Sequence, residues 1–292
     1  MIDFTPQPIL FQAGPIAVYW YGICYALGLG AAYAVLVRQA RFYRQDASII
    51  ANGMIVIAVA ALIGGRAYHV IDQWALYKDH LEKIVLPPYS GLGVYGGITT
   101  GVIAFLWLIR RYRVSGWVWA DIAAPALFVM QGIGRWGNFF NQELFGPPTN
   151  LPWGIAIDCA HRLTDHGQAL YPCADYPVAT THFQPLFLYE SVSGLVGAAV
   201  LIALSRSGRA RRWLRPGDLL LIFFIWYAAV RYLLENLRTG NWKLGDLATA
   251  QIFSIIFIAV ALAIMAWRHR LPASTIRGAD DAAPSEDGGT AA

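Results

Sequence analysis

Apolar residues along this chain gather in long runs that shorter polar segments separate. The runs predict seven helices, at residues 16–37, 49–71, 92–109, 119–140, 186–204, 218–235 and 247–267. Each run holds close to the roughly 17–25 residues with which a helix crosses the hydrocarbon core of a bilayer. The pattern therefore predicts an all-α integral membrane protein with seven transmembrane helices.

The segments outside the runs suggest how the chain is organised. Residues 141–185 are rich in Pro, Asp, His and Thr and predict a loop region between the fourth and fifth helices. Residues 271–292 consist largely of Pro, Ser, Gly, Asp and Ala, which is typical of a disordered tail. We expect residues 1–270 to form one transmembrane domain. The first 15 residues lack the basic start of a cleavable signal peptide.

Composition agrees with a membrane protein. The chain is 57% hydrophobic and 14% charged, whereas soluble domains carry about 25% charged residues. The net charge of +4 does not indicate nucleic-acid binding, because most basic residues lie in short loops between apolar runs. Fourteen arginines lie in the tail and in the loops after the first, third and fifth runs, against five basic residues in the opposite loops. Since cytoplasmic loops carry the excess of basic residues, we expect the N-terminus outside, the C-terminal tail in the cytoplasm and the 141–185 region outside.

Three further basic residues lie inside the apolar runs. Arg66, Arg135 and Arg231 each fall in the last third of a run that is expected to pass outward. A guanidinium at membrane depth is unfavourable unless it has a partner or a function. We therefore expect one polar cavity that opens toward the outer leaflet. Three planar guanidiniums favour an anionic ligand such as phosphate.

Carboxylates accompany two of these arginines. Arg231, Glu235 and Arg238 follow at i, i+4 and i+7, the spacing of one helix face. Glu190, at the start of the fifth run, is a further candidate for pairing with an arginine. The pattern also fits a transporter or channel for anionic solutes, or a non-catalytic lipid-binding membrane scaffold. Polar groups cluster at one side only, which argues against the transporter.

The segment Gly134–Gly146 reads GRWGNFFNQELFG. It resembles the signature of bacterial prolipoprotein diacylglyceryl transferases, GRxGNFxNxExxG, at all eight fixed positions. The resemblance covers roughly residues 10–268, and further matches are Tyr19–Gly22, Gly64–Arg66, Pro185–Glu190 and Arg231–Arg238.

This resemblance implies an enzyme that transfers the diacylglyceryl group of phosphatidylglycerol to the lipobox cysteine of preprolipoproteins, forming a thioether and releasing glycerol phosphate. It implies a multi-pass protein of the bacterial cytoplasmic (inner) membrane whose active site faces the outer leaflet. The partners would be phosphatidylglycerol, preprolipoprotein lipobox peptides and the lipid bilayer, with no nucleic acid. The chain has no ATP or metal motif, and a phosphodiester is already an activated group, so no cofactor and no metal are expected.

In such a transfer, negative charge moves from sulfur to the phosphate oxygens, where fixed cations and amide donors would stabilise it. The expected catalytic residues are Tyr21, Arg135, Asn138, Glu143, Arg231 and Glu235. The expected residues for binding phosphatidylglycerol are Arg66, Tyr95, Arg135, Asn138, Asn141, Gly146 and Arg238. The two glutamates of the catalytic set have three open roles: orienting an arginine, binding glycerol hydroxyls or accepting the thiol proton.

One position departs from the family pattern. Many members have a histidine before the Gly-Gly pair of the third helix, where this chain has Tyr95 followed by Gly96 and Gly97. Either another group of this enzyme takes the thiol proton, or the histidine is not a required base, and we favour the second interpretation. A cysteine thiol, with a pKa of about 8.5, is already partly ionised, and nearby arginines lower that pKa further.

The remaining predictions concern packing and cross-linking. Cys159 and Cys173 share the external loop region, an oxidising setting, and we expect them to form a disulfide. Rows of small residues predict close helix packing at Gly22, Ala26 and Gly30 and at Gly93, Gly97 and Gly101.

Overall fold

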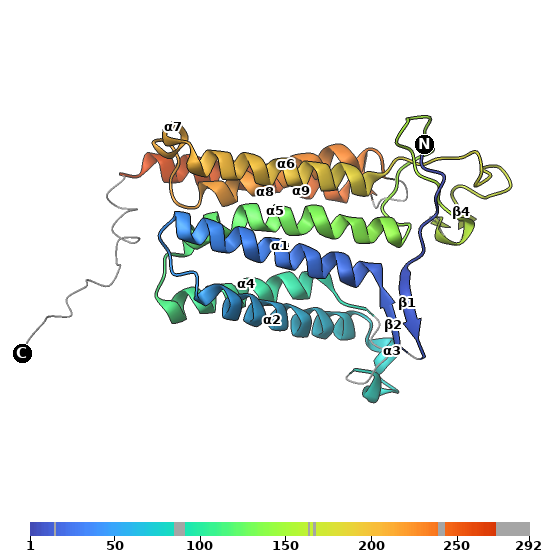
Figure 1. Cartoon of the computed structure of the whole chain (residues 1–292), viewed down its shortest axis with the longest axis horizontal. Helices are drawn as coiled ribbons and strands as arrows, with labels where there is room; N and C mark the ends of the chain where they lie inside the picture. Colours follow the sequence, from blue (N-terminus) through green and yellow to red (C-terminus); the bar gives the residue numbers. More distant parts are fainter. Residues whose placement is uncertain (15, 85–90, 163, 166–167, 239–242, 273–292) are drawn as a thin grey trace, which may run out of the picture. The chain divides into compact units, whose positions relative to one another are not determined.

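Seven long helices account for most of the described chain in the computed structural model (Figure 1). The structure describes residues 1–14, 16–84, 91–162, 164–165, 168–238 and 243–272. Within these ranges the long helices are α1 (Trp20–Phe42), α2 (Ile49–Asp72), α4 (Val94–Tyr112), α5 (Gly116–Phe140), α6 (Leu186–Arg206), α8 (Asp218–Glu235) and α9 (Thr249–Arg270). Short helical segments are α3 (Trp74–Tyr77), η1 (Leu81–Ile84), η2 (Cys159–His161) and α7 (Gly208–Arg211).

The strands form small antiparallel hairpins, one before α1 and two in connections between helices. They pair β1 (Ile9–Ala13) with β2 (Ile16–Tyr19), β3 (Thr164–Asp165) with β4 (Gln168–Ala169), and β5 (Lys243–Leu244) with β6 (Leu247–Ala248). The fold is therefore mostly helical, as the apolar runs predicted. The predicted disordered tail lies outside the described residues from position 273 onward.

Five of the long helices are long and apolar enough to cross a membrane by length and composition, namely α1, α2, α5, α6 and α9. Helix α8 carries Asp218, Arg231 and Glu235, and α4 ends with Arg110 and Arg111. Three charged residues within the 18 residues of α8, and two arginines in the last turn of α4, lower the mean hydropathy of these two helices.

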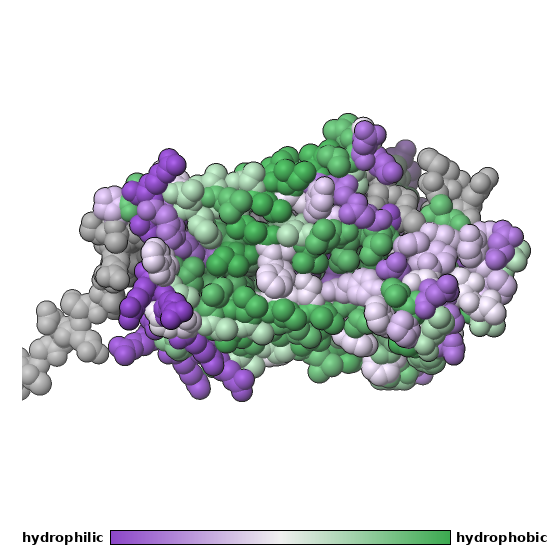
Figure 2. Space-filling view, turned by 90° about the horizontal axis from the view of Figure 1, so that it is seen from above, coloured by the Kyte–Doolittle hydropathy of each residue, from purple (hydrophilic) through white to green (hydrophobic). Residues whose placement is uncertain are grey.

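The surface of the helices agrees with a membrane environment. Large apolar side chains such as Leu27, Ile63 and Phe257 are exposed on the helix sides. Figure 2 shows hydrophobic residues over the sides of the helices and hydrophilic residues gathered toward helix ends. A helix that exposes apolar residues to water would be unfavourable, so these sides suit contact with lipid.

The start of the first predicted helix is wrong by four residues. Residues 16–19 form strand β2, whose Val18 pairs with Phe11 and whose Tyr19 pairs with Ile9. Valine and tyrosine suit a pleated strand, and the apolar run alone did not reveal that residues 9–13 supply a partner.

The described chain divides into two compact units, and each is described by itself. One consists of Met1–Leu36 and Ala120–Pro272, and the other includes Val37–Trp119. In the second unit α2 and α4 pack closely. A methyl group added to Gly64 would lie only 2.7 Å from the carbonyl oxygen of Gly96, so glycine is needed at this contact. Thr100 donates a hydrogen bond of 2.7 Å to the Ala60 carbonyl across the same contact.

The predicted rows of small residues are only partly correct. A methyl group on Gly97 would lie 3.2 Å from the Ala61 carbonyl oxygen, in agreement with close packing. Gly22 and Gly30 have no atom of the described chain within 4 Å of such a methyl group, whereas one on Gly28 would lie 3.2 Å from the Met130 carbonyl oxygen. Helix α1 therefore turns Gly28, rather than the predicted row, toward α5.

In the first unit, an acid on α5 holds the start of α8. The Asp121 carboxylate accepts hydrogen bonds from the backbone N–H groups of Gly217, Leu219 and Leu220, at 2.7, 2.9 and 3.2 Å. These are the N–H groups that a helix start leaves without internal partners. Below them lies an apolar core of Ala124, Phe128, Ala198, Leu201 and Leu219. Helix α8 is thus fixed beside α5 and α6. This packing sets the position of Arg231 and Glu235 at the other end of α8.

The connection between α5 and α6 has its own small core and a covalent link. Phe145, Ile155, Ile157 and Phe183 pack with Phe187 of α6. Cys159 and Cys173, the pair expected from the sequence, form a disulfide with their Cα atoms 5.9 Å apart. The described residues of this connection therefore pack against Phe139 at the end of α5 and Phe187 at the start of α6.

Candidate functional site

Glu190 links two of the predicted arginines in the first unit. Its carboxylate lies 2.5 Å from the Arg135 guanidinium and 3.9 Å from that of Arg231. The Glu190 side chain is only 5% exposed, and the two arginine side chains are about one quarter exposed, at 26% and 22%. Arg135 lies near the end of α5, Glu190 in the first turns of α6 and Arg231 near the end of α8. Three helices therefore bring these charges together at one end of the unit.

The end of α8 adds a second carboxylate and a third cation. Arg231 forms an ion pair of 2.8 Å with Glu235, as the i, i+4 spacing predicted. The prediction that Arg238 continues the same helix face is wrong, because α8 ends at Glu235 and Arg238 follows in a turn. Burial lowers the pKa of Arg238, and the charge of Arg231 lowers it further, while Glu235 and Glu190 raise it. Arg238 therefore belongs to the same electrostatic cluster.

This cluster has a definite charge balance. It contains the guanidiniums of Arg135, Arg231 and Arg238 and the carboxylates of Glu190 and Glu235. Within these five residues three positive charges face two negative ones, and the exposed carboxylate of Glu143 adds a third negative charge at the same end of α5. The guanidiniums of Arg135 and Arg231 are partly exposed, and their planar forks suit an anionic ligand such as a phosphodiester.

The segment after α5 folds back toward the helix end. Glu143 accepts hydrogen bonds from the side-chain amides of Asn138 and Asn141, at 2.8 and 3.4 Å. Its backbone N–H donates to the Asn138 carbonyl at 2.9 Å. The neighbours Gln142 and Leu144 have φ values of 52° and 59°, which make this return possible. The two asparagines expected to donate to a ligand thus face the Glu143 carboxylate, which is itself exposed.

Tyr21 and two signature glycines fit closely around this segment. A methyl group on Gly137 would lie 2.6 Å from the Tyr21 ring, so only glycine lets the ring approach α5. The Tyr21 hydroxyl lies 3.3 Å from that of Tyr25. The backbone N–H of Gly146 donates to Gln184 at 2.8 Å, and a methyl group on Gly146 would lie 2.8 Å from the Leu237 carbonyl oxygen. Gly146 thus allows the signature segment to lie against the chain that follows α8.

Arg66 and Tyr95 belong to the second unit. Arg66 donates to the backbone carbonyls of Lys83, Ile84 and Gly91 at 2.6, 3.1 and 3.2 Å, and its guanidinium lies over the Tyr77 ring. These contacts hold the connection between α2 and α4. The Tyr95 side chain is 72% exposed. Binding of phosphatidylglycerol by either residue stays a prediction.

An apolar groove of about 460 Å³ opens on the first unit. Its walls are almost wholly apolar and come from α6, α8 and the connecting segment, chiefly Tyr189, Val192, Val196, Trp226 and Trp153. Trp153 donates a hydrogen bond of 2.8 Å to the Tyr189 hydroxyl at its edge. Such a groove suits a hydrocarbon chain better than a charged headgroup.

Sequence reasoning missed two polar residues of the connecting segment. Gln142 is 1% exposed and pairs with Asp158 through both its amide nitrogen and its amide oxygen. Gln142 occupies a variable position of the signature, and Asp158 lies well outside it. The feature that marks Gln142 is its left-handed backbone together with a buried side chain, and this feature can be seen only in the folded structure.

The fold and the site together define a helical membrane protein with a partly buried ionic cluster suited to an anionic ligand. A sequence model of the prolipoprotein diacylglyceryl transferase family matches residues 8–267. The chain is 36% identical over 268 residues to the phosphatidylglycerol–prolipoprotein diacylglyceryl transferase of Nostoc sp., covering 91% of this chain and 90% of the relative. It is 37% identical over 267 residues to the enzyme of that name from Bacillus licheniformis, covering 90% and 93%. The chain therefore belongs to the prolipoprotein diacylglyceryl transferase family, and the resemblance seen in its signature is confirmed.

Proposed function

We propose that this protein transfers the diacylglyceryl group of phosphatidylglycerol to the lipobox cysteine of preprolipoproteins. The observation that supports this most directly is the cluster of Arg135, Arg231 and Arg238 with Glu190 and Glu235, whose partly exposed guanidiniums suit a phosphodiester. Membership of the family supplies the reaction class. A transporter or a non-catalytic scaffold would show no transfer, so the reaction itself separates these alternatives.

The transfer is a displacement at carbon. The cysteine sulfur attacks the glyceryl carbon that carries the phosphate, a C–S bond forms, and the C–O bond breaks with glycerol phosphate as the leaving group. The thiol proton goes to a base, and negative charge grows on the departing phosphate oxygens. Arg135 and Arg231 stabilise that charge, and fixed donors of this kind contribute about 10²- to 10³-fold in rate.

The three glutamates divide the remaining tasks. Glu190 and Glu235 form ion pairs with the arginines and hold the guanidiniums in place. Glu143 is exposed and accepts hydrogen bonds from two side-chain amides, so its carboxylate is the one that meets substrate. It accepts the thiol proton or binds the glycerol hydroxyls. Tyr21, which packs on the same end of α5, completes this side of the site.

We place the protein in the bacterial inner membrane with α1, α2, α4, α5, α6, α8 and α9 as its seven crossings. The charges of α4 and α8 lie near helix ends, where the bilayer interface accommodates them. The excess of arginines in alternate loops supports a cytoplasmic C-terminus. The Cys159–Cys173 disulfide supports an outward position for the connecting segment, since disulfides persist in oxidising compartments.

The test uses the purified full-length protein with phosphatidylglycerol and a synthetic lipobox peptide. Mass spectrometry follows the diacylglyceryl thioether, and a second assay follows glycerol phosphate. We expect product from the wild type, and for Arg135→Ala a rate lower by about 10²- to 10³-fold. Arg209→Ala, which removes an exposed arginine of α7, serves as the matched control. A folded wild type without product would contradict the proposed function, and equal rates for both variants would contradict the role of Arg135.

A further inference from the structure

Gln142 holds an unusual backbone conformation inside the signature segment. It lies between Asn141 and Glu143, at a position where the signature accepts any residue, and its φ is 52°. Residues other than glycine seldom adopt this left-handed conformation, which persists only where surrounding contacts impose it. The Gln142 side chain is 1% exposed, so its buried contacts can hold this conformation in place.

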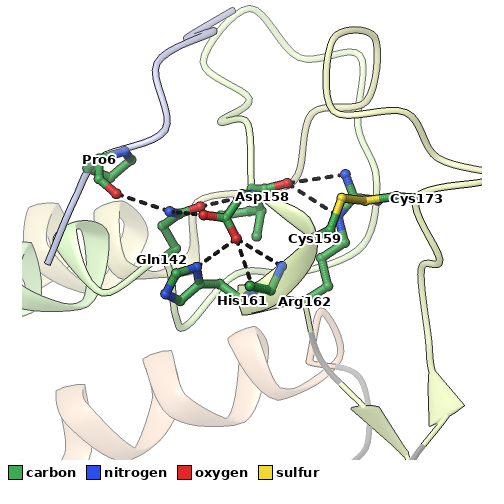
Figure 3. Close-up of polar contacts among 9 residues, drawn as sticks. Pro6, Gln142, Asp158, Cys159, His161, Arg162 and Cys173 are labelled. Atoms are coloured by element: carbon green, nitrogen blue, oxygen red, sulfur yellow. Dashed lines mark hydrogen bonds and ion pairs between the residues drawn. A yellow bond between two sulfur atoms is a disulfide. The ribbon is translucent and has the colours of Figure 1, made fainter.

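The Gln142 amide is held at three points (Figure 3). Its nitrogen donates to the Asp158 carboxylate at 2.7 Å and to the Pro6 carbonyl at 3.0 Å. Its oxygen accepts from the backbone N–H of Asp158 at 2.9 Å. Both amide hydrogens and the amide oxygen are therefore used, and two of the three bonds go to Asp158.

Asp158 is in turn fixed by the segment around it (Figure 3). Its second carboxylate oxygen accepts from the backbone N–H groups of Ala160 and His161, both at 3.0 Å, and from the His161 ring at 2.7 Å. The next residue, Cys159, is tied to Cys173 by the disulfide. The carboxylate thus joins a covalently closed loop on one side to the signature segment on the other.

Arg162 stiffens the same loop from within. Its guanidinium is buried and donates to the carbonyls of Ile157, Tyr171 and Tyr176, the last at 2.6 Å. These bonds join both sides of the disulfide-closed loop at the base of Asp158. Asp158 therefore presents its carboxylate to Gln142 from described residues that hydrogen bonds and a disulfide hold together.

We propose that Asp158 is a positioning residue: through Gln142 it holds the backbone turn that aims the Glu143 carboxylate at Asn138 and at the substrate. Asp158 touches none of the reacting atoms in this proposal. A change at φ of Gln142 rotates the peptide that leads to Glu143, and misplacing a reacting group by about 1 Å can lower a rate by about 100-fold. The effect on rate rests on the proposed function, whereas the effect on the backbone does not.

The pair can be exchanged to test this. Asp158→Asn places an amide NH₂ against either the Gln142 amide or the N–H groups of Ala160 and His161, so one set of donors loses its acceptor. Gln142→Glu opposes two carboxylates where the present contact is 2.7 Å. The double variant restores a donor opposite an acceptor, because the amide introduced at position 158 would donate to the carboxylate introduced at position 142. Only the Pro6 carbonyl would then lose its donor.

We expect each single variant to lower kcat by about 10- to 100-fold with KM for phosphatidylglycerol nearly unchanged, and the double variant to recover most of the loss. Asp175→Asn, the same chemical change at an exposed acid two residues beyond the disulfide-closed loop, should match the wild type. Single variants as fast as the wild type would overturn the proposal. A double variant as slow as the slower single variant would overturn it as well. In that case, restoring a donor opposite an acceptor would not restore the rate, and the two residues would have only a general structural role.

Hydrogen exchange gives a readout that does not depend on transfer. The backbone N–H groups of Gln142, Glu143 and Gly146 donate to Phe139, Asn138 and Gln184. We expect peptides spanning 141–146 to exchange faster in each single variant and at the wild-type rate in the double variant. Equal exchange in all four proteins would overturn the proposal, even if the wild type forms product. A wild type without product would contradict the proposed function, and exchange would still decide the role of Asp158.

Discussion

The carboxylate of Glu190 lies 2.5 Å from the guanidinium of Arg135, joining the start of α6 to the end of α5. The same carboxylate lies 3.9 Å from Arg231 on α8. Because Glu190 is buried, these contacts set both the position and the charge balance of the site.

Replacing Glu190 by glutamine should destabilise the protein and slow transfer. Removing one partner of a buried ion pair leaves the other charge uncompensated, which costs about 3–5 kcal/mol when burial is complete and less for arginines that are partly exposed. We therefore expect a lower unfolding temperature in detergent and a reduced rate of thioether formation. Glu82→Gln, at an exposed acid of η1, is the control and should change neither. Unchanged stability of Glu190→Gln would show that the ion pair is dispensable.

Arg135→Lys should be impaired although it keeps the positive charge. Lysine lacks the planar fork with which arginine binds two oxygens at once, and its ammonium cannot contact Glu190 and a phosphate in the same geometry. We expect a rate about tenfold or more below that of the wild type, with less loss than in Arg135→Ala. Arg209→Lys on α7 provides the exposed control. Full activity of Arg135→Lys would mean that charge alone is sufficient at this position.

Gly146→Ala should disturb the site by crowding. The added methyl group would lie 2.8 Å from the Leu237 carbonyl oxygen, and the backbone there cannot yield as a flexible side chain does. Overpacking of this kind destabilises by about 1–3 kcal/mol, and it would displace Arg238, the next residue. Gly30→Ala has open space around the new methyl group and should stabilise α1 by up to about 1 kcal/mol. In thermal unfolding we therefore expect Gly146→Ala to be less stable than the wild type and Gly30→Ala to be slightly more stable. Transfer activity should be lost only in Gly146→Ala.

The Cys159–Cys173 disulfide should protect the connecting segment from proteolysis. The two cysteines are 14 residues apart in sequence, and closing a loop of that size contributes about 3 kcal/mol in the chain-entropy model. We expect a Cys159→Ser/Cys173→Ser double variant to be cleaved faster within this loop under limited proteolysis, while Cys24→Ser is cleaved at the wild-type rate. Detection of two free thiols at these positions in protein purified without reductant would contradict the prediction.

The contribution of Asp158 to stability should depend on pH. Burial alone would raise the pKa of Asp158, but the hydrogen bonds from His161 and Gln142 outweigh this effect and hold the pKa below its ordinary value. A carboxylate with a lowered folded-state pKa stabilises the fold at pH values above its unfolded pKa of about 3.9, and the stabilisation is lost as the pH falls through the folded value. We therefore expect the difference in unfolding temperature between the wild type and Asp158→Asn to be constant near neutral pH and to narrow below about pH 4. A difference that does not narrow at all as the pH falls from 4 to 3 would contradict this assignment.

The long apolar runs predicted the helices because hydrophobic length is a local property. Five of them meet the length and composition of a membrane crossing, and seven long helices lie where the runs are. The start of α1 was misjudged, since residues 16–19 pair with β1, and a run of apolar residues does not distinguish a short strand from the first turn of a helix.

Contacts within one helix were also predictable. The Arg231–Glu235 ion pair follows from four-residue spacing on α8. The same reasoning failed for Arg238, because it assumed that the helix continues past Glu235. It also chose the wrong glycines of α1 for close helix packing, since the face that a helix buries depends on its neighbours.

Composition, hydrophobic length and one local motif were enough to establish the class of protein, the family, and the set of arginines and amides at the signature. The carboxylates that hold these groups were selected by the packing of the folded chain. Glu190 meets Arg135 and Arg231 because α5, α6 and α8 pack together, and Gln142 meets Asp158 because the connecting segment folds back over the end of α5. Partners far apart in the chain are chosen by packing and by the need to satisfy buried polar groups, and neither leaves a periodic mark in the sequence.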